Sequence, residues 1–285
     1  MTAPGDLPGE RVAVITGASA GIGLHTALGL AGDGMQVVLV GRDAGRTERA
    51  RRLVAERSGS QRITAALADF ASLAAVRHLA ETILAAHPRI DVLVNNAGLI
   101  SPRFQLSQDG YELTIAVNHL APFLLTNLLL DRLRASAPAR IVTVASQAHR
   151  GARLDLAELS RPRNWSPLSA YGRSKLCNVL FTSALAHRLD PREVTAACLH
   201  PGVVATAIGD RAGRVAGFGW RLIRPFLISP EKGAATSLFL ATAGDPTPFH
   251  GAYVIGRRIA EPDSAARGDR LAEDLWTESA RLVGL

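Results

Sequence analysis

The stretch RVAVITGASAGIG (11–23) joins two kinds of pattern. Its first six residues are rich in valine and isoleucine, as in a strand that is covered on both faces of a parallel sheet. TGASAGIG (16–23) follows and opens a helical pattern. Gly17, Gly21 and Gly23 allow a tight turn and a close approach of a ligand to the backbone, and the free N–H groups of a helix start favour a phosphate. The stretch therefore predicts a strand, a phosphate-binding turn and a helix in succession.

The rest of the chain continues this alternation of short apolar runs and longer helical patterns. Further strands are predicted at 36–41, 62–67, 90–95, 139–145, 194–200 and 252–256, and helices at 21–33, 43–58, 71–86, 108–135, 170–189 and 231–243. This order predicts an α/β fold with a parallel sheet and helices on both faces. Ligands of such sheets bind at the carboxyl ends of the strands. No linker divides the chain, so we expect one domain over residues 1–285.

The composition is that of a globular α/β protein. The chain has 285 residues, 47% of them hydrophobic, and a formal net charge of +7. No run of five or six basic residues occurs, so we expect a solvated surface and no nucleic-acid partner. Cys177 and Cys198 lack CxxC spacing and are expected to be reduced thiols in a cytoplasmic protein. No apolar run approaches the roughly 18 residues of a membrane helix, and residues 1–10 do not resemble a signal peptide, so we expect no stable membrane insertion.

The glycine turn also fits a second pattern, because GASAG (17–21) matches the G-x-S-x-G nucleophile elbow of α/β-hydrolases. On that interpretation Ser19 is a nucleophile, and Asp245 and His250 follow in the required order. The position of the motif argues against it, because the elbow needs an oxyanion partner from an earlier strand-to-helix loop. Only 16 residues precede Gly17.

GRDAGR (41–46) follows the second predicted strand, where dinucleotide-binding proteins recognise the adenosine ribose. A cofactor without a 2′-phosphate usually meets an acidic residue at this point, whereas this sequence has Gly41 and then Arg42. A guanidinium group pairs with a 2′-phosphate that a carboxylate would repel, so Arg42 predicts NADP(H) in preference to NAD(H). The alternative is that Arg42 is only a surface cation. Asp43 is expected either to touch the ribose or to cap the next helix.

AYGRSKLCNVLFTSALAHRL (170–189) has apolar residues at three- and four-residue steps. Tyr171 and Lys175 should therefore lie one turn apart on one helix face. A free tyrosine has a pKa of about 10, too high for a base at neutral pH. We expect the Lys175 ammonium to lower the pKa of the phenol, which then exchanges a proton with an alcohol or carbonyl oxygen. A snorkelling surface pair is the alternative, and the neighbouring motifs argue against it.

Three further motifs end predicted strands or interrupt a helix. IVTVASQAH (141–149) places Ser146 where a strand stops, and its hydroxyl is expected to hold the substrate oxygen. NNAG (95–98) ends another strand, and its glycine lets the backbone pass close to a cofactor. Asn118 is a polar residue in an apolar helical run, so it either stabilises the structure or orders water. Pro122 cannot donate to the Asn118 carbonyl, which is then free to hold a water that leads toward the lysine.

Together these motifs resemble those of the short-chain dehydrogenase/reductase family. The resemblance extends from Val12 to about Gly256, and it includes Asp69 after the third strand and HPGVVAT (200–206). It implies a single-domain Rossmann fold with a doubly wound, seven-stranded parallel sheet. It also implies a catalytic set of Asn118, Ser146, Tyr171 and Lys175. The cofactor contacts that it implies are Gly17, Ser19, Gly21, Ile22, Gly23, Arg42, Asp69, Asn95, Ala97, Gly98, Tyr171, Lys175, Pro201, Gly202, Val204 and Thr206.

Residues 109–130 and 169–189 are most similar to the retinol-dehydrogenase and WW-domain oxidoreductase branch of this family. That similarity implies an apolar alcohol or carbonyl substrate and often NADP(H). Two features depart from the branch. We expect no membrane anchor before the glycine turn. SQAH (146–149) stands where SS-x-AH is common, so Ala145 replaces a serine, which is expected to spare Ser146 but to alter the local hydrogen bonds.

The segment AIGDRAGRVAGFGWRLIRPFLISP (207–230) mixes glycine, arginine and large apolar residues. We expect it to form the substrate lid, and an interface between subunits or contact with a membrane surface are the alternatives. Trp165 is a candidate for another wall of the substrate site. His149 and His200 are expected to be structural, and no metal site is expected because no cluster of metal ligands appears.

These observations predict an NADP(H)-dependent oxidoreductase that interconverts an alcohol and a carbonyl compound. Tyr171 is expected to transfer the proton, Ser146 to fix the oxygen, Lys175 to lower the pKa of the tyrosine and Asn118 to anchor a water relay. The alternative is a nucleotide-binding regulator that keeps the fold without turnover. The expected partners are a small alcohol, aldehyde or ketone and, from the resemblance, further copies of the chain in a dimer or tetramer.

Overall fold

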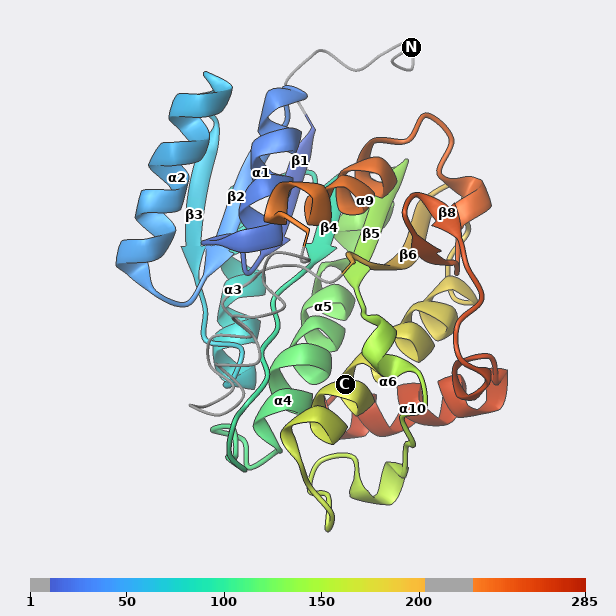
Figure 1. Ribbon diagram of the computed structural model, residues 1–285. Helices are drawn as coiled ribbons and strands as arrows, with labels where there is room; N and C mark the ends of the chain where they lie inside the picture. The colour runs from blue at the N-terminus through green and yellow to red at the C-terminus, as the bar shows by residue number, and fades with distance from the viewer. Residues whose placement is uncertain (1–10, 203–227) are drawn as a thin grey trace.

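The computed structural model describes residues 11–202 and 228–285, and one mixed sheet runs through this part of the chain (Figure 1). The strand order is β3-β2-β1-β4-β5-β6-β7-β8. The strands are β1 Val12–Thr16, β2 Gln36–Gly41, β3 Ile63–Leu67, β4 Val92–Asn95, β5 Ala139–Val144, β6 Val194–His200, β7 Tyr253–Ile255 and β8 Arg258–Ile259. All seven predicted strands are present and pair in parallel.

An eighth strand, β8, extends the predicted sheet and pairs antiparallel with β7. It forms because the chain reverses over Gly256 and Arg257, whose φ angles are 56° and 66°. Positive φ at both residues of a two-residue turn is the geometry that a tight hairpin requires. The prediction of an all-parallel sheet is therefore correct for β1 to β7 and wrong at this edge.

The strand order reverses between β1 and β4. Strands β2 and β3 follow one another on one side of β1. The chain then crosses back, and β4 pairs with the other side of β1. Helices that leave the two neighbouring strands therefore diverge to opposite faces, and a crevice opens at the carboxyl ends of β1 and β4. This crevice is where an open α/β sheet binds its ligand.

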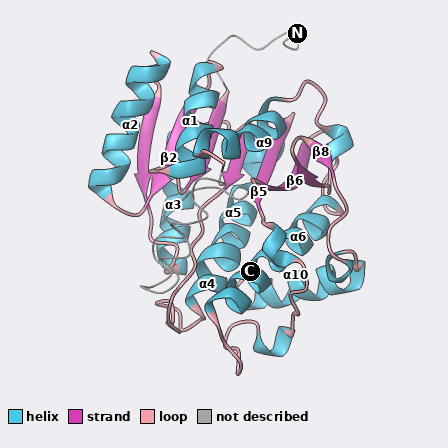
Figure 2. Cartoon of the chain, viewed as in Figure 1, coloured by secondary structure: helices cyan, strands magenta, loops and turns pink. Residues whose placement is uncertain are grey.

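Helices cover both faces of the sheet (Figure 2). Alternate residues of β1 point to different layers, so Ala13 and Ile15 join one core cluster whereas Val12 and Val14 join the other. The first layer contains α1 Gly21–Gly32, α2 Ala44–Ser58 and α9 Pro230–Thr242, and the second contains α3 Leu73–Ala86, α5 Ala121–Ala135 and α6 Pro167–Ala186. Shorter helical turns are η2 Gln147–His149, η3 Leu156–Glu158, η5 Thr247–Phe249 and η6 Ser264–Ala266.

The helix predicted at 108–135 begins later and is not uniform. It starts with α4 Leu113–Ile115, passes through a π-helical segment, η1 Ala116–Leu120, and continues as α5. By length and a mean hydropathy of 1.6 the stretch Leu113–Ala135 is apolar enough to cross a membrane, but 83% of its most apolar window is buried in the protein. It is a core helix of the second layer.

A last helix, α10 Asp269–Val283, was not predicted, and it packs outside α6. Trp276 lies 4.9 Å from the ring of Phe123 and 5.9 Å from that of Phe181, measured between ring centroids. Arg188, which follows α6, stacks on the Trp276 ring at 4.1 Å and pairs with Glu273. The C-terminal helix therefore covers the outer apolar side of α5 and α6.

Candidate active site

The glycine turn after β1 is fastened to the end of β4 by Thr16 and Asn96. The Thr16 hydroxyl accepts hydrogen bonds from the N–H groups of Asn96 and Ala97, both at 3.0 Å. Asn96 Nδ2 donates in return to the carbonyl oxygen of Thr16 at 2.8 Å. Gly17 has φ +66°, and a Cβ at this position would lie 2.8 Å from Ala97 Cα. Sequence reasoning missed Thr16 and Asn96, although both lie beside the glycine motifs.

The start of α1 is open to a ligand. Its N-cap is Ala20, with no side-chain cap and no acidic residue in the first turn, whereas α2, α3, α6 and α9 are each capped by a side chain. The first N–H groups of α1 therefore have no side chain to accept their hydrogen bonds. Ser19 and Ile22 are partly exposed at this turn. The uncapped helix start and the glycine turn fit the pyrophosphate of a dinucleotide.

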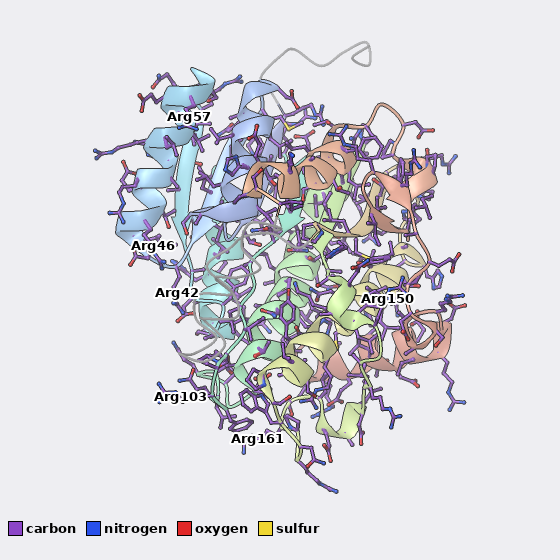
Figure 3. All side chains as sticks on the ribbon, in the orientation of Figure 1. Arg42, Arg46, Arg57, Arg103, Arg150 and Arg161 are labelled. Atoms are coloured by element: carbon purple, nitrogen blue, oxygen red, sulfur yellow. The ribbon has the colours of Figure 1, made fainter. Side chains whose placement is uncertain are left out.

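The end of β2 presents cations, with its one nearby carboxylate already engaged. Arg42 is exposed, and Asp43 Oδ1 accepts from the backbone N–H of Arg46 at 2.8 Å. Asp43 therefore caps α2, which settles the choice left open by the sequence. Figure 3 shows Arg42 and Arg46 along this edge of the molecule.

Two other predicted cofactor residues have their side chains occupied within the protein. Asp69 Oδ1 accepts from the N–H of Ala71 at 3.0 Å, which holds its carboxylate just beyond β3. The Asn95 side chain is 3% exposed and donates to the Thr126 hydroxyl at 2.8 Å. The structure therefore turns Asn95 into the α5 layer, and it is the next residue, Asn96, that reaches the glycine turn.

Lys175 is buried at the end of β5. Its ammonium donates to the carbonyl oxygen of Val144 at 2.7 Å, and its Nζ lies 5.6 Å from the centroid of the Tyr171 ring. Burial lowers the pKa of Lys175 to about 8. The predicted placement of the two side chains on one helix face is confirmed, but the lysine donates its hydrogen bond to the strand and not to the phenol.

Tyr171 on α6 and Ser146 after β5 lie close together at the same end of β5. Ser146 follows Ala145 just beyond the end of β5, and its hydroxyl is close enough to the Tyr171 phenol to affect the pKa of that phenol. Burial raises the pKa of the Tyr171 phenol, and the nearby Ser146 hydroxyl partly opposes that rise. The net direction is the reverse of the expected lowering by Lys175, because loss of solvent disfavours the phenolate more than its neighbours stabilise it.

Asn118 ties the loop after β4 to α6. Its Oδ1 accepts from Leu99 N–H at 2.8 Å, and its Nδ2 donates to the Leu99 carbonyl at 2.9 Å and to the Ser174 hydroxyl at 3.0 Å. A Cβ on Gly98 would lie 3.3 Å from Asn118 Oδ1 and 3.7 Å from Lys175 Nζ. Asn118 lies in the π-helical segment η1, and such segments are frequent at functional sites. The predicted residues Gly98, Asn118 and Lys175 are thus direct neighbours.

Trp165, which the sequence suggests as a wall of the substrate site, is held in place by Glu112 and Phe104. The Trp165 indole donates to Glu112 Oε1 at 3.1 Å and meets Phe104 edge to face at 5.9 Å. Glu112 is fully buried and also accepts from Ile115 N–H. Leu168 lies one turn before Tyr171 and is 76% exposed. Sequence reasoning proposed Trp165 but missed the buried carboxylate that fixes it.

The segment after β6 is described only in part. Pro201 and Gly202 are partly exposed, and Gly202 adopts φ +88° with Ile228 in contact. Val204 and Thr206, and the predicted lid 207–230 up to residue 227, lie outside the described residues. No group of three or more potential metal ligands occurs within 11–202 and 228–285.

The hydrolase interpretation is wrong, because Ser19 and His250 lie at opposite ends of the parallel sheet. Ser19 follows the carboxyl end of β1. His250 precedes β7, where its Nδ1 accepts from Ala196 N–H near the start of β6 and its Nε2 contacts the Ala186 carbonyl. A histidine at the amino end of the sheet cannot activate a serine at its carboxyl end.

Comparisons with known proteins agree with this geometry. The sequence profile of the short chain dehydrogenase family matches residues 11–214. Retinol dehydrogenase 13 of Mus musculus is 40% identical over 98% of this chain and 85% of its own length. Dehydrogenase/reductase SDR family member 13 of Homo sapiens is 42% identical over 99% of this chain and 75% of its own length.

Solved structures show the same fold. A crystal structure of a protein from Mycobacterium paratuberculosis has a TM-score of 0.78 and 33% identity over 98% of this chain and 96% of that one. L-sorbose reductase from Gluconobacter frateurii, complexed with NADPH and L-sorbose, has a TM-score of 0.67 and 25% identity over 86% of this chain and 94% of that one. The chain therefore belongs to the short-chain dehydrogenase family, in its retinol dehydrogenase branch, and is an NAD(P)-dependent oxidoreductase that acts on CH–OH groups.

Proposed function

We propose that this protein uses NADP(H) to interconvert an apolar alcohol and its carbonyl compound, with Tyr171 as the proton carrier. The observation that carries the proposal is the Tyr171 phenol, which lies beside the buried Lys175, with Nζ 5.6 Å from the ring centroid, and close to the Ser146 hydroxyl. All three groups lie at the carboxyl ends of the strands, next to the crevice between β1 and β4.

The bound nicotinamide would supply or accept the hydride at the substrate carbon. In carbonyl reduction, Ser146 holds the substrate oxygen and Tyr171 gives it a proton; in alcohol oxidation the same phenol takes that proton back. The phenolate left after donation is stabilised by the Lys175 ammonium nearby. Asn118 fixes the Leu99 loop beside Lys175, which is the position from which a proton relay would refill the site.

The preference for NADP(H) rests on the end of β2. Arg42 is exposed there and can pair with a 2′-phosphate, whereas the Asp43 carboxylate, which stays charged, is held at the N–H of Arg46 at the start of α2. Asp69 would then contact the adenine of the cofactor. Solved relatives are complexed with NADH in one case and with NADPH in another, and a direct comparison of the two cofactors tests the preference of this chain.

The preference for an apolar substrate rests on the exposed side chains around Tyr171. Six large hydrophobic residues are exposed in the described part of the chain, and Phe104, Leu106 and Leu168 are among them. Phe104 contacts Trp165, and Leu168 continues the face of α6 that carries Tyr171 and Lys175. Large exposed apolar groups at a site favour an apolar ligand. The relatives called retinol dehydrogenases fit this chemistry.

Turnover assays test the proposal against its alternative, a regulator that binds nucleotide without reaction. The purified protein is given NADPH or NADH with retinal, medium-chain aldehydes and polar ketones, and cofactor oxidation is followed at 340 nm (a wavelength set by the reduced nicotinamide ring). We expect turnover of the apolar aldehydes with NADPH in preference to NADH. NADPH binding without turnover of any substrate would favour the regulator.

We also propose a cytoplasmic location and a homo-oligomer. Cys177 and Cys198 are both free and buried, which supports a reducing compartment. Cell fractionation tests the location, and light scattering on the purified protein tests the oligomeric state.

A further inference from the structure

The peptide group between Ser146 and Gln147 is held at both of its polar ends by imidazole rings. Its carbonyl oxygen, on Ser146, lies 2.6 Å from His149 Nδ1. Its N–H group, on Gln147, donates to His200 Nδ1 at 3.2 Å. The two histidines come from different elements, because His149 ends the turn η2 whereas His200 ends β6.

The partners of each ring fix its tautomer. A carbonyl oxygen only accepts, so His149 Nδ1 carries the hydrogen, and His149 Nε2 is free to accept from the N–H of Asp263 at 3.0 Å. A backbone N–H only donates, so His200 Nδ1 carries no hydrogen. The bond that His200 Nδ1 accepts from Gln147 and the bond that His149 Nε2 accepts from Asp263 each require a neutral imidazole, and the two rings are in opposite tautomers.

The surroundings keep both rings neutral. His149 is fully buried and His200 is 7% exposed. Burial lowers the pKa of His200 to about 4, with His149 adding to the effect, and burial also lowers the pKa of His149. The charged groups that face His149 are Arg150 and Asp263, which act on it in opposite directions, and the Tyr253 ring packs against it at 4.9 Å.

The clamped peptide fixes the backbone at Ser146, and with it the direction of the Cα–Cβ bond. Ser146 is extended, with φ −164° and ψ 156°, and its Oγ accepts from Ala148 N–H at 3.2 Å. Rotation about ψ changes the angle between the peptide plane and the Cα–Cβ bond of the same residue. With the peptide fixed at both ends, the Cα–Cβ bond of Ser146 is fixed as well, and the bond from Ala148 N–H then restrains the hydroxyl about that bond.

We propose that His149 and His200 are positioning residues for Ser146, which together hold the Ser146–Gln147 peptide so that the hydroxyl meets the Tyr171 phenol and the substrate oxygen. This inference rests on the proposed function. His200 immediately precedes Pro201 and Gly202, so it also links the serine to the segment expected to line the nicotinamide. A purely structural role, in which His149 only anchors Asp263, is the competing explanation.

Matched substitutions separate the two explanations. In His149→Asn an amide nitrogen replaces Nδ1 and can still donate to the Ser146 carbonyl, but the acceptor for the N–H of Asp263 is lost. In His149→Gln an amide oxygen replaces Nε2 and can still accept from Asp263, but the donor to Ser146 is lost. For His200, Asn keeps an acceptor at the Nδ1 position, and Leu removes it. The Leu variants at both positions remove every ring bond.

The positioning role predicts that His149→Gln, His149→Leu and His200→Leu lose kcat by up to about 10²-fold, the cost of a displacement of about 1 Å at a reacting group, with little change in KM or NADPH affinity. His149→Asn and His200→Asn keep a kcat near that of the native protein. The double Leu variant loses no more than the worse single one, because both rings act on one peptide. Equal kcat for His149→Asn and His149→Gln, with a lower Tm for the former alone, would show a structural role instead.

A second readout needs no turnover and so stands apart from the proposed function. The sequence has three tyrosines, so a protein labelled with ¹³Cζ-tyrosine gives a Tyr171 signal that Tyr171→Phe identifies. We expect His149→Leu and His200→Leu to shift this signal in the direction that Ser146→Ala shifts it, and the Asn variants to leave it in place. A Tyr171 signal that moves in Ser146→Ala but in neither Leu variant overturns the inference, even for a protein without a known substrate.

Discussion

The ammonium of Lys175 lies 5.6 Å from the centre of the Tyr171 ring, and its hydrogen bond goes to the carbonyl of Val144. The pair thus places a buried cation close to a phenol, while the hydrogen bond of the cation goes elsewhere. Burial raises the pKa of Tyr171 and lowers that of Lys175 to about 8. The protein alone therefore keeps the phenol protonated, as a proton donor for carbonyl reduction must be.

The buried ammonium is expected to cost stability. The pKa of Lys175 is about 8 in the folded protein against 10.5 for the free group, so the unfolded chain holds its proton over a pH range in which the folded one has lost it. The destabilisation is complete below pH 8 and is relieved as the pH rises from about 8 to 10.5. Relative to Lys175→Met, the native protein should gain about 3 kcal/mol of unfolding free energy over this window.

Urea unfolding at several pH values measures this gain. The sequence contains two lysines, and Lys232 is exposed, so Lys232→Met is the matched control and should change with pH as the native protein does. The same pH dependence in the native protein and in Lys175→Met would contradict the lowered pKa.

Thr16 is expected to hold the cofactor turn in place. Thr16→Val leaves the N–H groups of Asn96 and Ala97 without their acceptor, at a cost of about 1–3 kcal/mol for each buried group. We expect a lower Tm and weaker NADPH binding, measured by calorimetry. Thr16→Ser keeps the hydroxyl and should restore both; if it binds NADPH as poorly as the valine variant, the hydroxyl is not the cause.

Arg42 is expected to select the 2′-phosphate. Arg42→Ala should raise KM for NADPH by about tenfold or more, the loss of a charge-assisted bond of about 1.5–3 kcal/mol, and should leave KM for NADH nearly unchanged. Arg57, at the other end of α2, provides a control substitution of the same kind. An unchanged ratio of NADPH to NADH in Arg42→Ala would remove Arg42 from the cofactor site.

Leu168 is expected to favour apolar substrates. It is 76% exposed one turn before Tyr171, so Leu168→Ser should leave the fold stable, because little buried surface is lost. KM should rise for a long-chain aldehyde and change little for a short one. Ile259 is exposed at β8, and Ile259→Ser is the control. A uniform effect on both aldehydes would place Leu168 outside the substrate path.

The sequence predicts the parts of this fold whose signal is local. Continuous apolar runs such as 36–41 mark strands that helices cover on both faces, and the parallel order then brings Ser146 and Tyr171 to one edge. The helix α10 also has a local signal, which is the helical spacing of the apolar residues Ala272, Leu275 and Leu282. The strand β8 has only two residues, too few for any periodicity.

Long-range contacts account for what the sequence could not show. In the sequence Thr16 is an ordinary strand residue, and its role appears only when β4 lies beside it in the fold. Asn95 and Asn96 are likewise equivalent in the sequence, and only the sheet directs their side chains to opposite faces. The rise in the Tyr171 pKa comes from burial by the folded chain, which sequence spacing does not reveal. The two histidines around Gln147 are separated by 51 residues and meet only in the folded structure.

Carbonyl reduction by Tyr171→Phe tests the central claim most directly. With NADPH and the best aldehyde substrate, kcat should fall by about 10²–10⁴-fold, the usual contribution of a proton-transferring group, while NADPH binding is kept. Tyr111→Phe is the control, since the Tyr111 hydroxyl donates to the carbonyl of Leu282 in the last turn of α10, and this variant should keep its activity. A Tyr171→Phe protein that reduces the aldehyde as fast as the native one would show that the phenol does not carry the proton.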